Sequence, residues 1–174
     1  MNLRSAIELF FGGEGSGCNP AAAEANGTAC GPPVTKQFDY KNLKQQALAI
    51  KSLSTEFTRA VGTQYVYRGI KGSIANKVQA AIDSGKAVEV PLNSLSSWSL
   101  SPTTAQGFGN TVLRMKINPE DVWVNSRALL HMFGGMAGEQ ELIVGSKTPT
   151  VTFTPDDVKT YGHKPSWWKG SKYD

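Results

Sequence analysis

At 174 residues, 40% of them apolar, the chain has the length of one domain with a sizeable core. Its net charge of +4 is a mild excess spread along the sequence, which is not typical of a nucleic-acid-binding protein. No apolar run approaches the roughly 18–20 residues that span a bilayer, so the sequence predicts no membrane partner. The N-terminus lacks the layout of a secretory signal, and we therefore expect action in the cytoplasm.

The N-terminal part of the chain is expected to form a short helix and then a flexible arm. Apolar side chains share one helical face over residues 2–11, whereas residues 12–33 are rich in Gly, Asn and Pro. Such a composition buries too little apolar surface to offset the entropy of ordering it. We therefore assign residues 1–33 to a helix and arm, and residues 34–174 to the compact domain.

The two cysteines, Cys18 and Cys30, both lie in this arm. A disulfide between them would close only a short loop, and two cysteines without nearby histidines do not complete a zinc site. We interpret them as unpaired thiols and expect no bound metal.

The compact domain is predicted to have its helices early and most of its strands late. Apolar residues at helical spacing predict helices over 40–61 and 73–84, the second capped by Ser73. A short helix is expected over 102–108, capped by Ser101. Alternating and β-branched residues predict strands over 64–70, 87–92, 95–99, 111–117, 141–144 and 150–153. Residues 119–138 are expected to form a loop region, and the chain after its two adjacent tryptophans a short polar tail. This order predicts an α+β fold, because no βαβ pattern is sustained.

Three short segments carry the chemistry, and the first is Tyr67-Arg68-Gly69 at the end of a predicted strand. A guanidinium on a strand is held stiffly, which suits paired hydrogen bonds to a pyrophosphate. Gly69 would let backbone approach a ligand closely. The other interpretation of Arg68 is an ordinary ion pair at the surface.

The second segment is Ser97-Trp98-Ser99, which runs on through Ser101 to Phe108. Alternating serines on a strand can hydrogen-bond a neighbouring carboxylate and fix its position. Strand alternation predicts that Trp98 points away from such a site. The alternatives are a serine-rich loop for the segment and a core position for Phe108.

The third segment is Glu139-Gln140-Glu141, which leads into an apolar strand. Alternation places both carboxylates on one face, where they repel each other unless a positive charge lies between them. A fixed carboxylate there could stabilise a developing cation. The other interpretation is an exposed strand edge kept from aggregating by its charge.

In this order the three segments resemble the Arg–Ser–Glu signature of the mono-ADP-ribosyltransferases, in the form with two glutamates that modifies arginine. The resemblance implies an ADP-ribosyltransferase-like fold: two packed antiparallel sheets with flanking helices and NAD in the cleft between them. It implies that NAD is the substrate, cleaved at the nicotinamide–ribose bond, and that ADP-ribose passes to an acceptor. Trp98 departs from the family pattern, which has threonine between the two serines.

The resemblance also implies a role for each residue. NAD would be bound by Arg68 and its neighbours Tyr67 and Gly69, by Ser97 and Ser99, and by Phe108. Glu141 would stabilise the ribose cation with the help of Ser97, and Glu139 would orient the acceptor. The apolar, glycine-rich loop over 129–138 stands where the family recognises its target, and Phe133 is the residue we expect to contact it.

Two other functions fit these residues. One is an NAD glycohydrolase toxin with no acceptor, which would keep Arg68 and Glu141. The other is a non-enzymatic, virion-associated structural module tethered by the arm. We expect a monomer whose target is an unnamed protein, with a nucleic-acid acceptor left open. Delivery with a phage particle or secretion as an effector also stays open.

Overall fold

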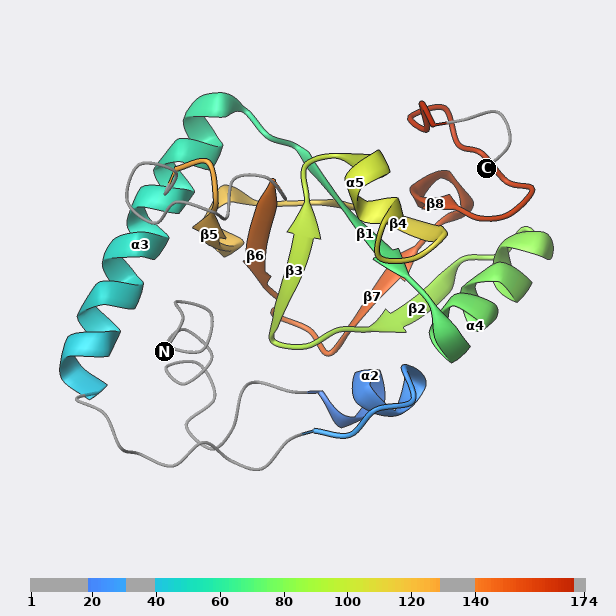
Figure 1. Cartoon of the computed structure of the whole chain (residues 1–174), viewed down its shortest axis with the longest axis horizontal. Helices are drawn as coiled ribbons and strands as arrows, with labels where there is room; N and C mark the ends of the chain where they lie inside the picture. The colour runs from blue at the N-terminus through green and yellow to red at the C-terminus, as the bar shows by residue number, and fades with distance from the viewer. Residues whose placement is uncertain (1–18, 31–39, 129–139, 171–174) are drawn as a thin grey trace.

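A six-stranded antiparallel sheet forms the centre of the fold in the computed structural model, which describes residues 19–30, 40–128 and 140–170 (Figure 1). Its strand order is β5-β6-β3-β1-β4-β8. The bounds of these strands are β1 (Tyr65–Ile70), β3 (Leu95–Ser99), β4 (Thr111–Lys116), β5 (Val122–Asn125), β6 (Glu141–Gly145) and β8 (Val158–Lys159). A second, smaller sheet pairs β2 (Val88–Pro91) with β7 (Thr150–Phe153).

Helices flank the two sheets and complete the predicted α+β class. They are α2 (Pro20–Ala25), α3 (Tyr40–Val61), α4 (Gly72–Asp83) and α5 (Pro102–Gln106), with short 3₁₀ turns η1 (Pro119–Asp121) and η3 (Pro155–Asp157). The main core joins one face of the large sheet to α4 and to the small sheet. It includes Val66 from β1, Val78 from α4, Val90 from β2 and Phe153 from β7, all almost fully buried. No helix in the described part of the chain is long and apolar enough to cross a membrane.

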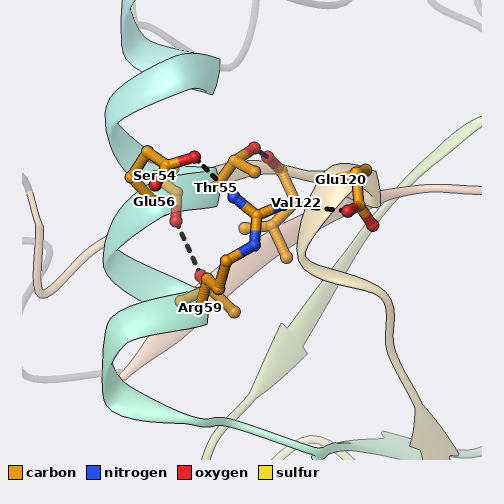
Figure 2. A network of polar contacts seen from close by, with 7 residues as sticks. Ser54, Thr55, Glu56, Arg59, Glu120 and Val122 are labelled. Atoms are coloured by element: carbon orange, nitrogen blue, oxygen red, sulfur yellow. Dashed lines mark hydrogen bonds and ion pairs between the residues drawn. The ribbon is translucent and has the colours of Figure 1, made fainter.

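The long helix α3 packs against β5 at one edge of the large sheet (Figure 1). Ala47 and Ile50 bury their side chains against Trp123 and Val124. Polar contacts surround this apolar strip, and Figure 2 shows Arg59 of α3 reaching Glu120 of η1, 2.8 Å away. The helix is confirmed over its predicted length.

Strand β5 corrects the expectation of a loop over 119–138. All four of its residues are buried, so the strand has no alternation between apolar and polar positions. A run this short, buried on both faces, cannot be recognised by periodicity alone. The cap of α4 is also different from the prediction. Lys71 occupies the N-cap position and makes no side-chain cap bond, so Ser73 is not the cap.

Glycines allow α5 to pack very closely on β1. A Cβ atom added at Gly69 would lie 1.9 Å from the carbonyl oxygen of Ala105, and one added at Gly109 would lie 2.1 Å from that of Ile70. Neither position has room for a side chain. Ser101 caps α5 as predicted, since its hydroxyl accepts a hydrogen bond from the backbone N–H of Thr104 at 3.3 Å.

Residues 19–30 fold back onto the body, which corrects the expectation of a linker for this stretch. Asn19 caps α2 by accepting from the N–H of Ala21, and its side-chain amide donates to the carbonyls of Leu92 and Pro149, both at 2.9 Å. Ala22 and Ala23 lie on the buried face of α2. The small alanine side chains and one asparagine are sufficient to dock a segment that composition alone predicts to be flexible.

The expectation of two unpaired thiols is also wrong, because Cys30 is disulfide-bonded. The other cysteine of the sequence, Cys18, lies outside the described residues. The division between the predicted arm, residues 1–33, and the compact domain, residues 34–174, stays a prediction.

The two adjacent tryptophans near the C-terminus pack against the body, and residues 171–174 of the predicted polar tail lie outside the described residues. Trp168 is 8% exposed and lies with Ala105 and Val112 in a small core of its own. The ring of Trp167 stacks at a tilt on Tyr67, with 5.3 Å between ring centroids. The N-terminal segment therefore packs on β2 and α4, and the C-terminal stretch packs on α5 and β4.

Candidate active site

A pocket of about 330 Å³ lies where β1, β3, β6 and α5 meet. These strands are neighbours in the sheet, in the order β6-β3-β1, so each of the three predicted segments reaches the same place. The lining residues are Tyr67, Arg68, Gly69, Ser97, Trp98, Ser99, Ala105, Phe108 and Glu141. Every predicted site residue in the described part of the chain is in this set. Glu139 and Phe133 lie outside the described residues.

Ser97 and Glu141 make the closest polar contact of the pocket. The hydroxyl of Ser97 donates a hydrogen bond of 2.6 Å to Oε1 of Glu141. The strand register explains the contact: Ser99 lies opposite Glu141, and Ser97 is two residues along the same face of β3. A hydroxyl bonded to a carboxylate at this length is a charge-assisted hydrogen bond, which fixes the position of the carboxylate.

Arg68 spans from β1 to β3. Its Nη1 donates to the carbonyl oxygen of Ser97 at 3.1 Å, and its guanidinium carbon lies 6.0 Å from the centroid of the Trp98 ring. β1 pairs with β3 at Tyr67 and Ser99, so Arg68 stands next to that pair. The guanidinium and the carboxylate of Glu141 therefore both converge on Ser97.

Trp98 is a pocket residue that sequence reasoning placed elsewhere. It is 2% exposed and belongs to the main core, and its indole N–H donates to the hydroxyl of Ser96 at 2.8 Å. It also lines the pocket, beside Arg68. Ala105 was missed as well, because nothing in its sequence context shows that Gly69 draws α5 against the strand.

Two aromatic side chains complete the wall on the α5 side. The ring of Tyr67 is half-buried and lies at a tilt on that of Trp167, and burial raises the pKa of its hydroxyl. Phe108 is 57% exposed although it lines the pocket.

The backbone before Glu141 is strained. Gln140 has a φ of 48°, a conformation that a residue with a side chain adopts at a cost. Its carbonyl oxygen accepts a hydrogen bond from the N–H of Leu100 at 3.1 Å. The turn into β6 is therefore tied to the end of β3, beside the pocket. Among the described residues there is no group of three or more side chains that could hold a metal ion.

The large antiparallel sheet, the small second sheet, the flanking helices and the pocket define an ADP-ribosyltransferase fold. A family model described as dinitrogenase reductase ADP-ribosyltransferase matches residues 25–148, which is more than half of the chain. The chain therefore belongs to the dinitrogenase reductase ADP-ribosyltransferase family, and it is a transferase that uses NAD as its substrate. No curated protein and no solved structure was found to match it. The resemblance seen in the sequence is confirmed at the level of an ADP-ribosyltransferase family.

Proposed function

We propose that the chain is a mono-ADP-ribosyltransferase of the Arg–Ser–Glu class, which transfers ADP-ribose from NAD to arginine side chains of a target protein. The hydrogen bond of 2.6 Å between Ser97 and Glu141, with Arg68 bonded to the same serine, is the observation that carries this proposal. A protein acceptor is consistent with the name of the family, whose members are named for a protein that they modify.

The residues that line the pocket have different roles in binding NAD and in catalysis. Arg68 binds the pyrophosphate, for which a planar guanidinium with five N–H donors is well suited. Phe108 and Tyr67 flank the nicotinamide end. Ser97 fixes the carboxylate of Glu141 beside the ribose.

The chemistry breaks one bond and forms another. The bond from C1′ of the ribose to the pyridinium nitrogen breaks, and nicotinamide leaves as a neutral molecule with the bonding electron pair. The positive charge that develops on the ribose is stabilised by the carboxylate of Glu141. A guanidinium nitrogen of the acceptor then bonds to C1′ and gives up one proton. We assign this proton to Glu139, two residues before Glu141.

The variant Glu141→Gln tests the proposal directly. It keeps the size of the side chain and removes the charge, so we expect loss of both nicotinamide release and label transfer from radiolabelled NAD to lysate proteins. Glu89→Gln is the matched control, because Glu89 is exposed on β2 and does not line the pocket. Full transfer by Glu141→Gln would remove Glu141 from the mechanism. Nicotinamide release without protein labelling by the unaltered chain would identify a glycohydrolase.

The acceptor assignment has a separate test in Glu139→Gln. If Glu139 takes the proton of the attacking guanidinium, this variant loses transfer to a small arginine analogue but still hydrolyses NAD to nicotinamide and ADP-ribose. The two products are measured in the same reaction by chromatography. Unchanged labelling of the arginine analogue would show that Glu139 does not serve the acceptor.

A further inference from the structure

Tyr67 connects the pocket with the C-terminal stretch of the described chain. Its residue lines the site of Glu141 from β1, and the ring of Trp167 packs on its ring at a tilt, with 5.3 Å between the centroids. Two rings at this separation make a favourable aromatic contact. The family match ends at residue 148, so Trp167 lies outside it. A wall of the pocket is therefore contacted from behind by a residue that the family match does not cover.

Trp167 is fixed on the body by contacts other than the one with Tyr67. Its indole N–H donates a hydrogen bond of 2.6 Å to the backbone carbonyl of Asp156. The guanidinium carbon of Arg114 lies 5.5 Å from the centroid of the Trp167 ring, which is within the range of a cation–π contact. The hydrogen bond orients the indole and the cation lies over it, so Trp167 can support a neighbouring ring rather than follow its movements.

Arg114 is itself held by an ion pair and by a second ring. Its Nη2 donates to Oδ1 of Asp157 at 3.0 Å, and Oδ2 of the same carboxylate accepts from the hydroxyl of Thr154 at 3.0 Å. Its guanidinium carbon lies 4.3 Å from the centroid of the Tyr65 ring. The strand register places Arg114 directly opposite Tyr67, so the two side chains project from the same face of the large sheet. The Tyr67 ring therefore lies in a network whose other members are fixed.

We propose that Trp167 is a positioning residue for the transferase: it holds the ring of Tyr67 in the wall of the pocket where NAD binds. This role rests on the proposed function, in which Tyr67 flanks the nicotinamide end. Without the indole, the Tyr67 ring loses a neighbour that restricts it, and NAD must order a looser wall as it binds. The cost falls on binding and not on the chemical step, because Ser97 and Glu141 keep their own hydrogen bond.

Trp167→Ala should therefore raise the KM for NAD about three- to tenfold, the range expected for loss of one aromatic pair, and should change kcat by less than about twofold. Trp167→Phe keeps a ring beside Tyr67 and should restore most of the affinity. Steady-state kinetics of nicotinamide release measures both constants, and urea denaturation checks that each variant is folded. Trp167→Leu, which also lacks the ring, takes the place of Trp167→Ala if that variant does not fold. An unchanged KM in the folded variant overturns the proposal.

Tyr65→Ala is the matched control. Tyr65 is also a tyrosine of β1 and also packs on Arg114, but it does not line the pocket. The variant should leave the KM for NAD unchanged. A rise in KM equal to that of Trp167→Ala would show a general loosening of this face of the sheet, and it would overturn the positioning role.

Tyr67→Ala separates the positioning role from the proposed function. Alone, it should raise the KM for NAD at least as much as Trp167→Ala does. In the double variant, Trp167→Ala should add no further rise, because its effect passes through Tyr67. If Tyr67→Ala raises the KM but Trp167→Ala does not, or if the two effects add, the positioning role is wrong and the proposed function stands. If Tyr67→Ala leaves the KM unchanged, the part of Tyr67 in the proposed function is wrong, and the positioning role is wrong with it.

Discussion

At the scale of single residues, the site depends on how Ser97 holds Glu141. The carboxylate begins β6 beside a strained Gln140, and the hydroxyl of Ser97 bonds it from the next strand at 2.6 Å. The carbonyl of the same serine accepts from Arg68. One residue therefore contacts both the group proposed to bind the pyrophosphate and the group proposed to stabilise the ribose cation, so its loss should affect the chemical step.

Ser97→Ala should lower kcat about 10- to 100-fold with little change in the KM for NAD, which is the loss expected for one hydrogen bond to a charged group. Steady-state kinetics of nicotinamide release measures both parameters. Ser97→Thr keeps the hydroxyl and should restore most of the rate. Ser96→Ala is the control next to it. It leaves the buried indole N–H of Trp98 without its acceptor, so it should reduce stability and spare kcat. An unchanged kcat in Ser97→Ala would mean that the function of Glu141 does not depend on the hydrogen bond from Ser97.

At the scale of elements, α3 makes two different kinds of polar contact: an exposed ion pair with η1 and buried hydrogen bonds with β5. Arg59 pairs with Glu120 at the surface (Figure 2), and a hydrogen bond between them raises the pKa of Arg59. The pKa of Glu120 is lowered by a backbone hydrogen bond and then by Arg59, so any stability from this carboxylate is present above its ordinary pKa and is lost as the pH falls through the lowered one. Because both groups are exposed, we expect this ion pair to contribute little to the free energy of unfolding.

The hydrogen bonds between α3 and β5 are buried, so their loss has a larger expected cost than loss of the exposed ion pair. The backbone N–H of Asn125 in β5 donates a hydrogen bond to the hydroxyl of Ser54 at 2.9 Å, and its side-chain amide donates to the hydroxyl of Thr58 at 3.0 Å. All three residues are buried. Removing one partner leaves buried polar groups unpaired, which costs about 1–3 kcal/mol for each group. We therefore expect the buried hydrogen bonds with β5 to contribute more to the free energy of unfolding than the exposed ion pair with η1.

Asn125→Ala keeps the backbone bond to Ser54 but removes the side-chain bonds to Thr58 and from the N–H of Arg127. It should lower the free energy of unfolding by about 1–3 kcal/mol in urea denaturation. Arg59→Ala removes only exposed ion pairs of α3, so it is the control and should leave the midpoint almost unchanged. Equal losses of unfolding free energy in the two variants would contradict the expectation that the buried hydrogen bonds contribute more than the ion pair. A smaller loss in Asn125→Ala than in Arg59→Ala would reverse it.

At the scale of the whole molecule, the sequence predicted those parts whose burial follows a simple period. α3 and the strand β2 have that period. The order of the three motifs, with the resemblance they carry, predicted that Arg68, Ser97 and Glu141 share one site. β5 was missed because it is buried on both faces. Residues 19–30 and Trp168 were missed because their burial depends on partners far away in the chain, which no local pattern records.

The C-terminal stretch of the described chain packs on α5 and β4, and Trp168 offers the clearest test of how much this packing contributes to stability. Trp168 buries its ring against Ala105 and Val112, and the Nζ of Lys159 lies 4.9 Å from the ring centroid. Trp168→Ala should lower the free energy of unfolding by about 3–5 kcal/mol, the usual cost of emptying a large aromatic site. Because Ala105 belongs to α5 and lines the site of Glu141, the KM for NAD should rise as well.

Trp168→Phe distinguishes packing from hydrogen bonding. The indole N–H of Trp168 is buried and has no hydrogen-bond partner among the described residues, so replacing it with phenylalanine removes an unpaired donor and keeps an aromatic ring. The loss of stability should then be well below that of Trp168→Ala. Tyr161→Ala, at a residue 82% exposed in the same stretch, should have almost no effect. If Trp168→Ala unfolds at the same urea concentration as the unaltered chain, the C-terminal stretch does not pack on α5 and β4 in solution. If Trp168→Phe is as damaging as Trp168→Ala, the indole N–H makes a bond that its burial in this structure does not account for.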